Sequence, residues 1–362
     1  MRSAQRHADV LLAALAGVAT TFVLAGNIGR SFDYDESVAV WSIVRRGSPT
    51  TAFTETEVFN NHPIFSAGQS LWWAMGGVGE TRQRLFPVSF GALAVALLVG
   101  WATRRFGARS GVAAGLVLAL NPMFVTQARA VRGYSLAVLG VTLSVICLLE
   151  YVRDPERRDR VAVWLLVGHA AGIVLAIGTH AVSIVALGPV GLAALVLLGR
   201  VDRRLALSWL GAGLGVALVY GWTIEALLDT ADARGNRYFG LLGRLTLEEL
   251  LGRDQVTVTL HAGLLVVAAV VCAGRAPQLR TKWFVASILI TVLLVAQFLF
   301  LWQIVQPFDL YSRFFLGVVP LMAMAIAAAV RHRGGAARGR RARRRLRRRR
   351  CAIGARGPTR VP

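Results

Sequence analysis

The amino-acid sequence predicts an all-α polytopic membrane protein with about ten transmembrane helices. Hydrophobic residues make up 55% of the 362 residues, and the mean hydropathy is +0.56, which exceeds the usual apolar content of a soluble domain. The apolar residues form long runs, and nearly all charged residues lie between these runs. Each run approaches the roughly 20 apolar residues that a helix needs to cross a bilayer.

The predicted spans follow one another along most of the chain. The first run has an alternative interpretation as the apolar region of a signal peptide, but no small-residue cleavage site follows it, so we expect a span. The run 63–79 is short, contains Gln69 and Ser70, and ends at charged residues, so it is not counted. The predicted spans lie at 9–28, 85–102, 110–127, 133–152, 161–179, 181–199, 205–224, 257–274, 283–303 and 313–330.

The distribution of charge predicts the orientation. If 63–79 does not cross, the basic connections near residues 104, 153, 200 and 280 all share one side with the N-terminus. The opposite side then holds 13 of the 19 acidic residues. Because basic loops stay on the cytoplasmic side, we expect a multi-pass plasma-membrane protein with both termini in the cytoplasm.

The long external segment 27–84 is predicted to fold on the membrane surface. Val38, Trp41 and Val44 recur at helical spacing, as expected for a helix that lies in the interface. The segment 63–79, with its paired tryptophans, has the composition of a second interfacial helix.

The chain therefore reads as one membrane domain over 1–330, with a second external loop at 225–256, followed by a tail at 331–362. The tail holds fourteen arginines and no acidic residue, which leaves about +8 of the formal net charge of +22 for the rest of the chain. We expect a disordered cytoplasmic tail that is attracted to anionic lipid headgroups, by about 1 kcal/mol per basic residue, and no nucleic-acid partner.

An acidic cluster follows the first span. Asp33 and Glu36 have the spacing of a capping box, in which each side chain bonds the other residue's backbone at a helix start. Capping leaves Asp35 unexplained. Three neighbouring acids are costly to hold together unless they are solvated, bound to a metal or opposed by arginines, so Asp35 is a candidate for chemistry.

A basic motif lies at the external junction of the third and fourth predicted spans. Arg129, Arg132 and Tyr134 stand there, although basic residues are sparse in the short external connections. The planar guanidinium donates two hydrogen bonds to a phosphate at once. The alternative interpretation is that these arginines reach lipid headgroups.

Four further polar residues are predicted at the same membrane face. His62 begins the second interfacial segment, and His180 lies in the turn between the fifth and sixth spans. Arg84 and Arg313 precede apolar runs. Each alone is explained as an interfacial residue, but ionisable groups gathered at one depth of a bundle indicate a functional site. Because His169, His261 and Gln297 are the main strongly polar residues well inside the spans, an ion-coupled transporter is disfavoured.

The chain resembles the GT-C superfamily of membrane glycosyltransferases. It is most similar to the family of protein mannosyltransferases, aminoarabinose transferases and Rgt-like enzymes. The likeness covers residues 9–200 and, more weakly, 306–325. It rests on short motifs in order, which are Asp35-Glu36, His62-Pro63, Arg84-Leu85-Phe86-Pro87, Asn121-Pro122, Arg132-x-Tyr134, Thr179-His180 and Arg313-Phe314.

The resemblance implies a GT-C-like fold and a polyprenyl-phosphate sugar donor that is used at the external face. By the resemblance, Asp35 is the catalytic carboxylate and Glu36 its neighbour in the site. The chain departs from some relatives, which have a second acid near Arg129–Arg132 or a soluble C-terminal domain, so the acceptor (glycan, lipid or protein) and the metal stay open.

The chemistry of such a donor agrees with the residues. A phosphate leaving group needs positive charge more than a general acid, so one carboxylate can deprotonate the acceptor while arginines hold the phosphate, with inversion at the sugar. The expected phosphate-binding residues are Arg132, Arg129, Arg84, Arg313 and Tyr134, with His62, His180 and Asp33 as further substrate or metal contacts. A divalent metal is compatible with the sequence but not required. The alternative function is a non-catalytic or transport protein, such as a flippase for lipid-linked sugars or a degenerate homologue.

Overall fold

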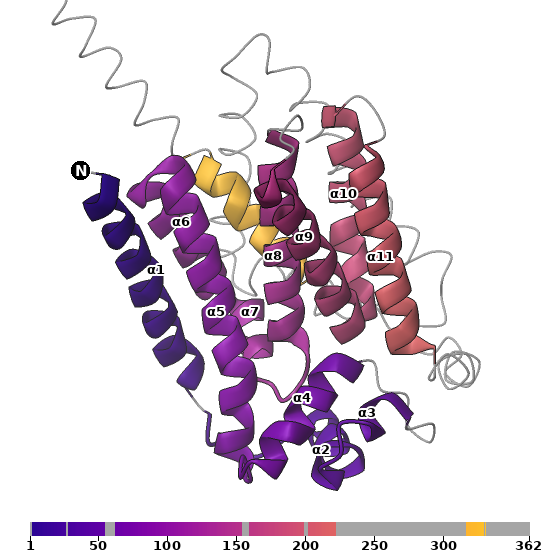
Figure 1. Cartoon of the computed structure of the whole chain (residues 1–362). Coiled ribbons are helices and arrows are strands. Elements are labelled where there is room, and N and C mark those ends of the chain that lie inside the picture. The colour runs from indigo at the N-terminus through magenta and orange to yellow at the C-terminus, as the bar shows by residue number, and fades with distance from the viewer. Residues whose placement is uncertain are drawn as a thin grey trace, which may run out of the picture.

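The computed structural model describes residues 2–26, 28–54, 62–153, 159–198, 202–221, 316–328 and 330. The described chain is helical and contains no strand. Long helices run up and down in a bundle, and short helices gather at one end of it (Figure 1). The bundle contains α1 (Arg2–Ala25), α5 (Glu80–Phe106), α6 (Ala108–Ala119), α7 (Pro122–Ala128), α8 (Tyr134–Arg153), α9 (Arg160–Thr179), α10 (Ile184–Leu198), α11 (Arg203–Tyr220) and the helix Val318–Ala328. The short elements are α2 (Tyr34–Ser42), η1 (Val44–Arg46), α3 (Thr51–Thr54), α4 (Pro63–Ala74) and η2 (Ala181–Ser183).

Four of the described helices, α1, α5, α8 and α9, are each long and apolar enough to cross a membrane. The predicted span over 110–127 corresponds to a bent pair of helices, because α6 and α7 meet at a bend of 64°. The break has a local cause. The Asn121 side chain accepts a hydrogen bond from the Phe124 amide, and Pro122 occupies the first turn, so a new helix begins there.

The remaining predicted spans are described in part. Helix α10 has 15 residues and begins only at Ile184, and α11 has 18. The predicted spans 257–274 and 283–303, the loop 225–256 and the tail 331–362 lie outside the described residues. The count of ten spans therefore stays a prediction. Helix α4 has 12 residues, about 18 Å at 1.5 Å per residue, which is too short to cross a bilayer core of about 30 Å, as the sequence predicts.

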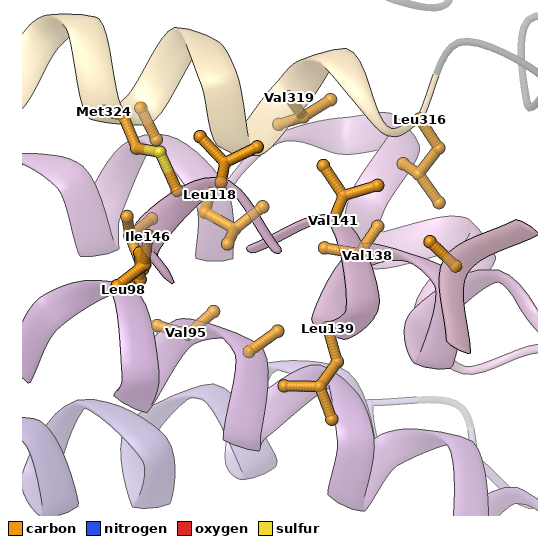
Figure 2. Close-up of a cluster of buried hydrophobic side chains, with 14 of the residues drawn as sticks. Val95, Leu98, Leu118, Val138, Leu139, Val141, Ile146, Leu316, Val319 and Met324 are labelled. Atoms are coloured by element: carbon orange, nitrogen blue, oxygen red, sulfur yellow. The ribbon is translucent and has the colours of Figure 1, made fainter. Parts of the chain in front are cut away.

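Helix α8 forms the centre of the bundle. In its most apolar window 78% of the residues are buried, against 17% for α1, whose Leu15 and Phe22 side chains point outward as expected for a lipid-facing helix. Figure 2 shows side chains of α5, α6 and α8 meeting the helix Val318–Ala328, with Leu98, Val138 and Val319 among them.

Close backbone contact joins α8 to α9. A methyl group at Gly172 would lie 2.7 Å from the Gly140 carbonyl oxygen and 2.6 Å from the Ser144 amide nitrogen, so only glycine fits there. The indole N–H of Trp209 donates to His169 Nε2 at 2.9 Å, so His169 Nδ1 carries the proton and donates to the Ser144 carbonyl oxygen at 3.1 Å. His169 is thus a neutral link between α8, α9 and α11.

A proline fixes the position of α4 against α5. Pro87 lies inside α5 and has no N–H, which frees the carbonyl of Gln83 four residues earlier. The Gln69 side chain of α4 donates to this carbonyl at 2.9 Å. The short helices are thereby attached to the end of the bundle at which α5 begins.

Candidate functional site

Glu36 lies at the centre of the polar residues that gather at this end of the bundle. Its side chain is 0% exposed. Oε2 accepts from Arg84 Nη2 at 2.6 Å and from the Asp33 amide at 3.0 Å. Oε1 accepts from Arg84 Nε at 3.2 Å and from the Val131 amide at 2.8 Å. One buried carboxylate therefore joins α2, α5 and the loop between α7 and α8.

The helix start that places Glu36 was visible in the sequence. The Asp33 side chain accepts from the Glu36 amide at 2.8 Å, and both halves of the capping box are present. Asp33 is half-exposed and lies 3.8 Å from Arg30, a residue that the sequence analysis did not single out. Asp33 therefore acts in the structure as a helix cap.

Arg84 is buried and has no N–H group to spare. Its five donors have five acceptors, two on the Glu36 carboxylate and three on backbone carbonyls. The carbonyls are those of Ile28 at 3.0 Å, Ser31 at 3.1 Å and Arg30. Its guanidinium is engaged by an internal ion pair and by the linker after α1, so donor-phosphate binding by Arg84 stays a prediction that these contacts do not support.

Asp35 and Arg132 form the accessible part of the cluster. The Asp35 side chain is 38% exposed and that of Arg132 is 14% exposed. Arg132 Nη1 lies 3.6 Å from Asp35 Oδ2 and donates to the Asp35 backbone oxygen at 3.2 Å. These two residues are neighbours of the buried contact, since Asp35 precedes Glu36 and Arg132 follows Val131.

Arg129 points away from this pair, toward the end of α1. Its Nη1 donates to the Gly26 carbonyl oxygen at 2.8 Å, and its Nε is buried without a described partner. Burial lowers the pKa of Arg129, and the nearby cations Arg30 and Arg84 lower it further, whereas Glu36 raises it. An arginine remains charged at neutral pH all the same. The structure thus separates Arg129 from Arg132, which the sequence had grouped together.

Three rings pack together directly behind the Arg132 loop. The centroids of His62 and Tyr134 lie 5.1 Å apart, and those of His62 and His180 5.2 Å apart. His62 Nδ1 lies 2.7 Å from the Thr179 carbonyl oxygen, so it must donate, which makes Nε2 the acceptor nitrogen. A methyl group at Gly133 would lie 3.0 Å from His62 Nδ1, so the loop fits closely against this cluster.

The structure thus brings nine of the ten expected site residues to one end of the bundle, eight of them in two adjoining groups and Arg129 beside these, against the end of α1. Arg313 lies outside the described residues. The described residues contain no group of three or more His, Cys, Asp or Glu that could hold a metal ion. Sequence reasoning missed Arg30 and the Val131 amide. Arg30 was visible as a basic residue beside the acids, whereas a backbone N–H has no signal in the sequence.

A shallow hollow of about 390 Å³ lies elsewhere, and none of the expected site residues lines it. Its walls are apolar and come from α3 and the end of α11, at Thr50, Phe53, Thr54, Leu218 and Val219. The chemistry-bearing side chains and this hollow are therefore distinct features.

Comparison with known proteins identifies related sequences and folds. Residues 55–230 match the sequence profile of the dolichyl-phosphate-mannose-protein mannosyltransferase family. The fold is similar to two crystal structures of ArnT from Cupriavidus metallidurans, one in the apo state (TM-score 0.60) and one bound to undecaprenyl phosphate (TM-score 0.57). Each is 18% identical over 88% of this chain and 59% of its own, so this chain spans less than two thirds of their length. No curated protein matches the sequence.

Proposed function

We propose that this chain, a member of the GT-C superfamily of membrane glycosyltransferases, transfers a sugar from a polyprenyl-phosphate donor to an acceptor hydroxyl. The reaction takes place at the membrane face that carries Asp35, which the charge distribution predicts to be external. The acceptor is a glycan, a lipid or a protein. The ArnT structure with undecaprenyl phosphate supports a donor of this chemical class.

One observation carries the proposal, namely the accessible carboxylate of Asp35 beside the guanidinium of Arg132. A sugar bound over this pair presents its anomeric carbon to an acceptor hydroxyl on the Asp35 side. Its phosphate then lies on the Arg132 side, where the planar fork can donate two hydrogen bonds. A carboxylate buried like Glu36 could not reach a substrate.

The reaction follows from these positions. Asp35 removes the proton of the acceptor hydroxyl as its oxygen attacks the anomeric carbon. The bond between that carbon and the phosphate oxygen breaks, and its electron pair leaves with the polyprenyl phosphate. Arg132 stabilises the negative charge that develops on the leaving oxygen. A single displacement of this kind inverts the anomeric centre.

The other expected residues take supporting roles in this proposal. His62, His180 and Tyr134 form the wall behind the Arg132 loop, and we assign them to the side of the site that faces the sugar or the acceptor. Arg129 faces the end of α1 and is a second candidate for a lipid phosphate. The arginine-rich tail adds attraction to anionic headgroups at the plasma membrane.

The test is a turnover assay on the full chain in lipid nanodiscs. A panel of polyprenyl-phosphate sugars is supplied with a membrane extract as the source of acceptors, and the release of polyprenyl phosphate is followed. We expect release with at least one donor, and its loss in Asp35→Asn. Transbilayer movement of the intact lipid-linked sugar without release of polyprenyl phosphate would instead establish the transport alternative.

A further inference from the structure

The buried pair Glu36–Arg84 holds together three parts of the chain that are distant in the sequence, namely the segment 28–36, the start of α5 and the loop after α7. Arg84, in α5, donates hydrogen bonds to backbone carbonyls of the linker after α1. Glu36 lies in the first turn of α2, and its carboxylate accepts a hydrogen bond from the Val131 amide in the loop after α7. Glu36 and Val131 are 95 residues apart in the chain.

Asp35 and Arg132 each lie next to one partner of the hydrogen bond between the Val131 amide and the Glu36 carboxylate. Asp35 directly precedes Glu36, and Arg132 directly follows Val131. The distance between the Asp35 carboxylate and the Arg132 guanidinium is therefore set by a short path through the structure. The path runs from Asp35 through the Glu36 carboxylate to the Val131 amide and on to Arg132. Arg84 holds that carboxylate with two hydrogen bonds, so the path has little freedom.

We infer that Glu36 and Arg84 are positioning residues, which set the spacing of Asp35 and Arg132 for sugar transfer. The inference rests on the proposed function. Reacting groups need close alignment, and a misplacement of about 1 Å can lower turnover by roughly 10²-fold. Glu36 thus contributes to the reaction without touching the substrate.

If Glu36 and Arg84 only stabilise the fold, restoring stability should also restore turnover. A paired substitution can therefore distinguish a positioning role from a purely structural one. Removing one partner of a buried ion pair leaves an uncompensated charge, whereas replacing both by apolar residues of similar volume often restores stability. The paired variant Glu36→Leu with Arg84→Met should therefore have a higher Tm than Glu36→Leu alone, while the backbone groups that the pair bonded keep it below the wild type. It lacks the acceptor for the Val131 amide, so the Arg132 loop is no longer held.

The experiment measures Tm, kcat, KM for the donor, and the Kd for undecaprenyl phosphate in the full-length protein. The matched control is Glu150→Leu with Arg105→Met, which removes the ion pair at the other end of α5. We expect the Glu36/Arg84 paired variant to show a Tm between those of Glu36→Leu and the wild type, a roughly 10²-fold lower kcat and a roughly tenfold weaker Kd. The control pair should leave kcat and Kd within about twofold of wild type.

Recovery of Tm, kcat and Kd together in the Glu36/Arg84 paired variant would overturn the inference. If that variant does not fold, Arg84→Lys decides, because lysine keeps the charge but loses the planar fork. We expect a folded Arg84→Lys protein with at least tenfold lower kcat and weaker Kd, and wild-type values in both would again overturn the inference. If the wild type itself turns over no donor, the proposed function fails, and the Kd for undecaprenyl phosphate still tests the positioning of Arg132.

Discussion

The two ends of α5 each carry an arginine–glutamate pair, and the pairs differ in what surrounds them. Arg84 and Glu36 are both 0% exposed, and their contacts extend to three backbone carbonyls and two backbone amides. At the opposite end, Arg105 and Glu150 are 21% and 27% exposed. Glu150 also accepts from the Trp101 indole at 2.8 Å, so this pair joins only α5 and α8.

The difference shows that residue type and pairing do not by themselves reveal a role. The Arg105–Glu150 pair fastens two neighbouring helices at a hydrated end of the bundle. The Arg84–Glu36 pair is buried, organises irregular backbone and lies directly beside the partly exposed pair of Asp35 and Arg132. Function is therefore expected at the Arg84 end alone, and this comparison can be tested with substitutions at both ends.

The largest expected effect is at Asp35. Asp35→Asn keeps the size and hydrogen bonding of the side chain but cannot accept the acceptor's proton, so turnover should fall by about 10²–10⁴-fold while the Kd for undecaprenyl phosphate persists. The matched control is Asp33→Asn, two positions earlier, because asparagine caps helices about as well as aspartate. If Asp35→Asn retained more than about half of the activity, chemistry would lie elsewhere.

A second test compares the stability of the two ends directly. Arg84→Ala leaves Glu36 as a buried unpaired charge and should lower the free energy of unfolding by about 3–5 kcal/mol. Arg105→Ala removes a partly hydrated pair and should cost about 1 kcal/mol. Denaturation in detergent, followed by circular dichroism, measures both values. Equal losses of unfolding free energy in Arg84→Ala and Arg105→Ala would contradict the distinction between the two ends of α5.

The third test concerns phosphate recognition by Arg132. Arg132→Ala should lower kcat/KM by an amount equivalent to about 2–5 kcal/mol, because a charge partner of the phosphate is lost. Arg132→Lys retains the charge without the fork and should lie between the wild type and Arg132→Ala. If both variants matched the wild type, Arg132 would be a headgroup anchor, and Arg129 would become the residue to test next.

The smallest expected effect is in the tail. Deletion of residues 338–362 removes no apolar face that could pack against the bundle, so turnover of the purified protein should stay within about twofold of the wild type. The same deletion is expected to lower the amount of protein in the membrane, measured by immunoblot, because attraction to anionic headgroups is lost. A tenfold loss of turnover in detergent would assign a catalytic contribution to the tail.

Local features of the sequence were enough to predict the helical membrane fold and several helix boundaries. The capping box at Asp33 and Glu36 depends on residues three positions apart, and both of its hydrogen bonds are present. The apolar runs predict α1, α5, α8 and α9, because crossing a bilayer requires only length and apolarity. The proline at 122 was visible as well, but the 64° bend was missed because apolarity continues through it.

Only the tertiary structure decided which polar residues are available to a substrate. From sequence, the capping box distinguished Glu36 from Asp35 but did not reveal the burial of Glu36, and Arg84 was as good a phosphate ligand as Arg132. The fold buries Glu36 against Arg84, 48 residues away, and leaves Asp35 exposed beside Arg132, 97 residues away. Hydrogen bonds and burial depend on which segments meet in space, and the spacing of charged residues along a chain carries no information about those encounters.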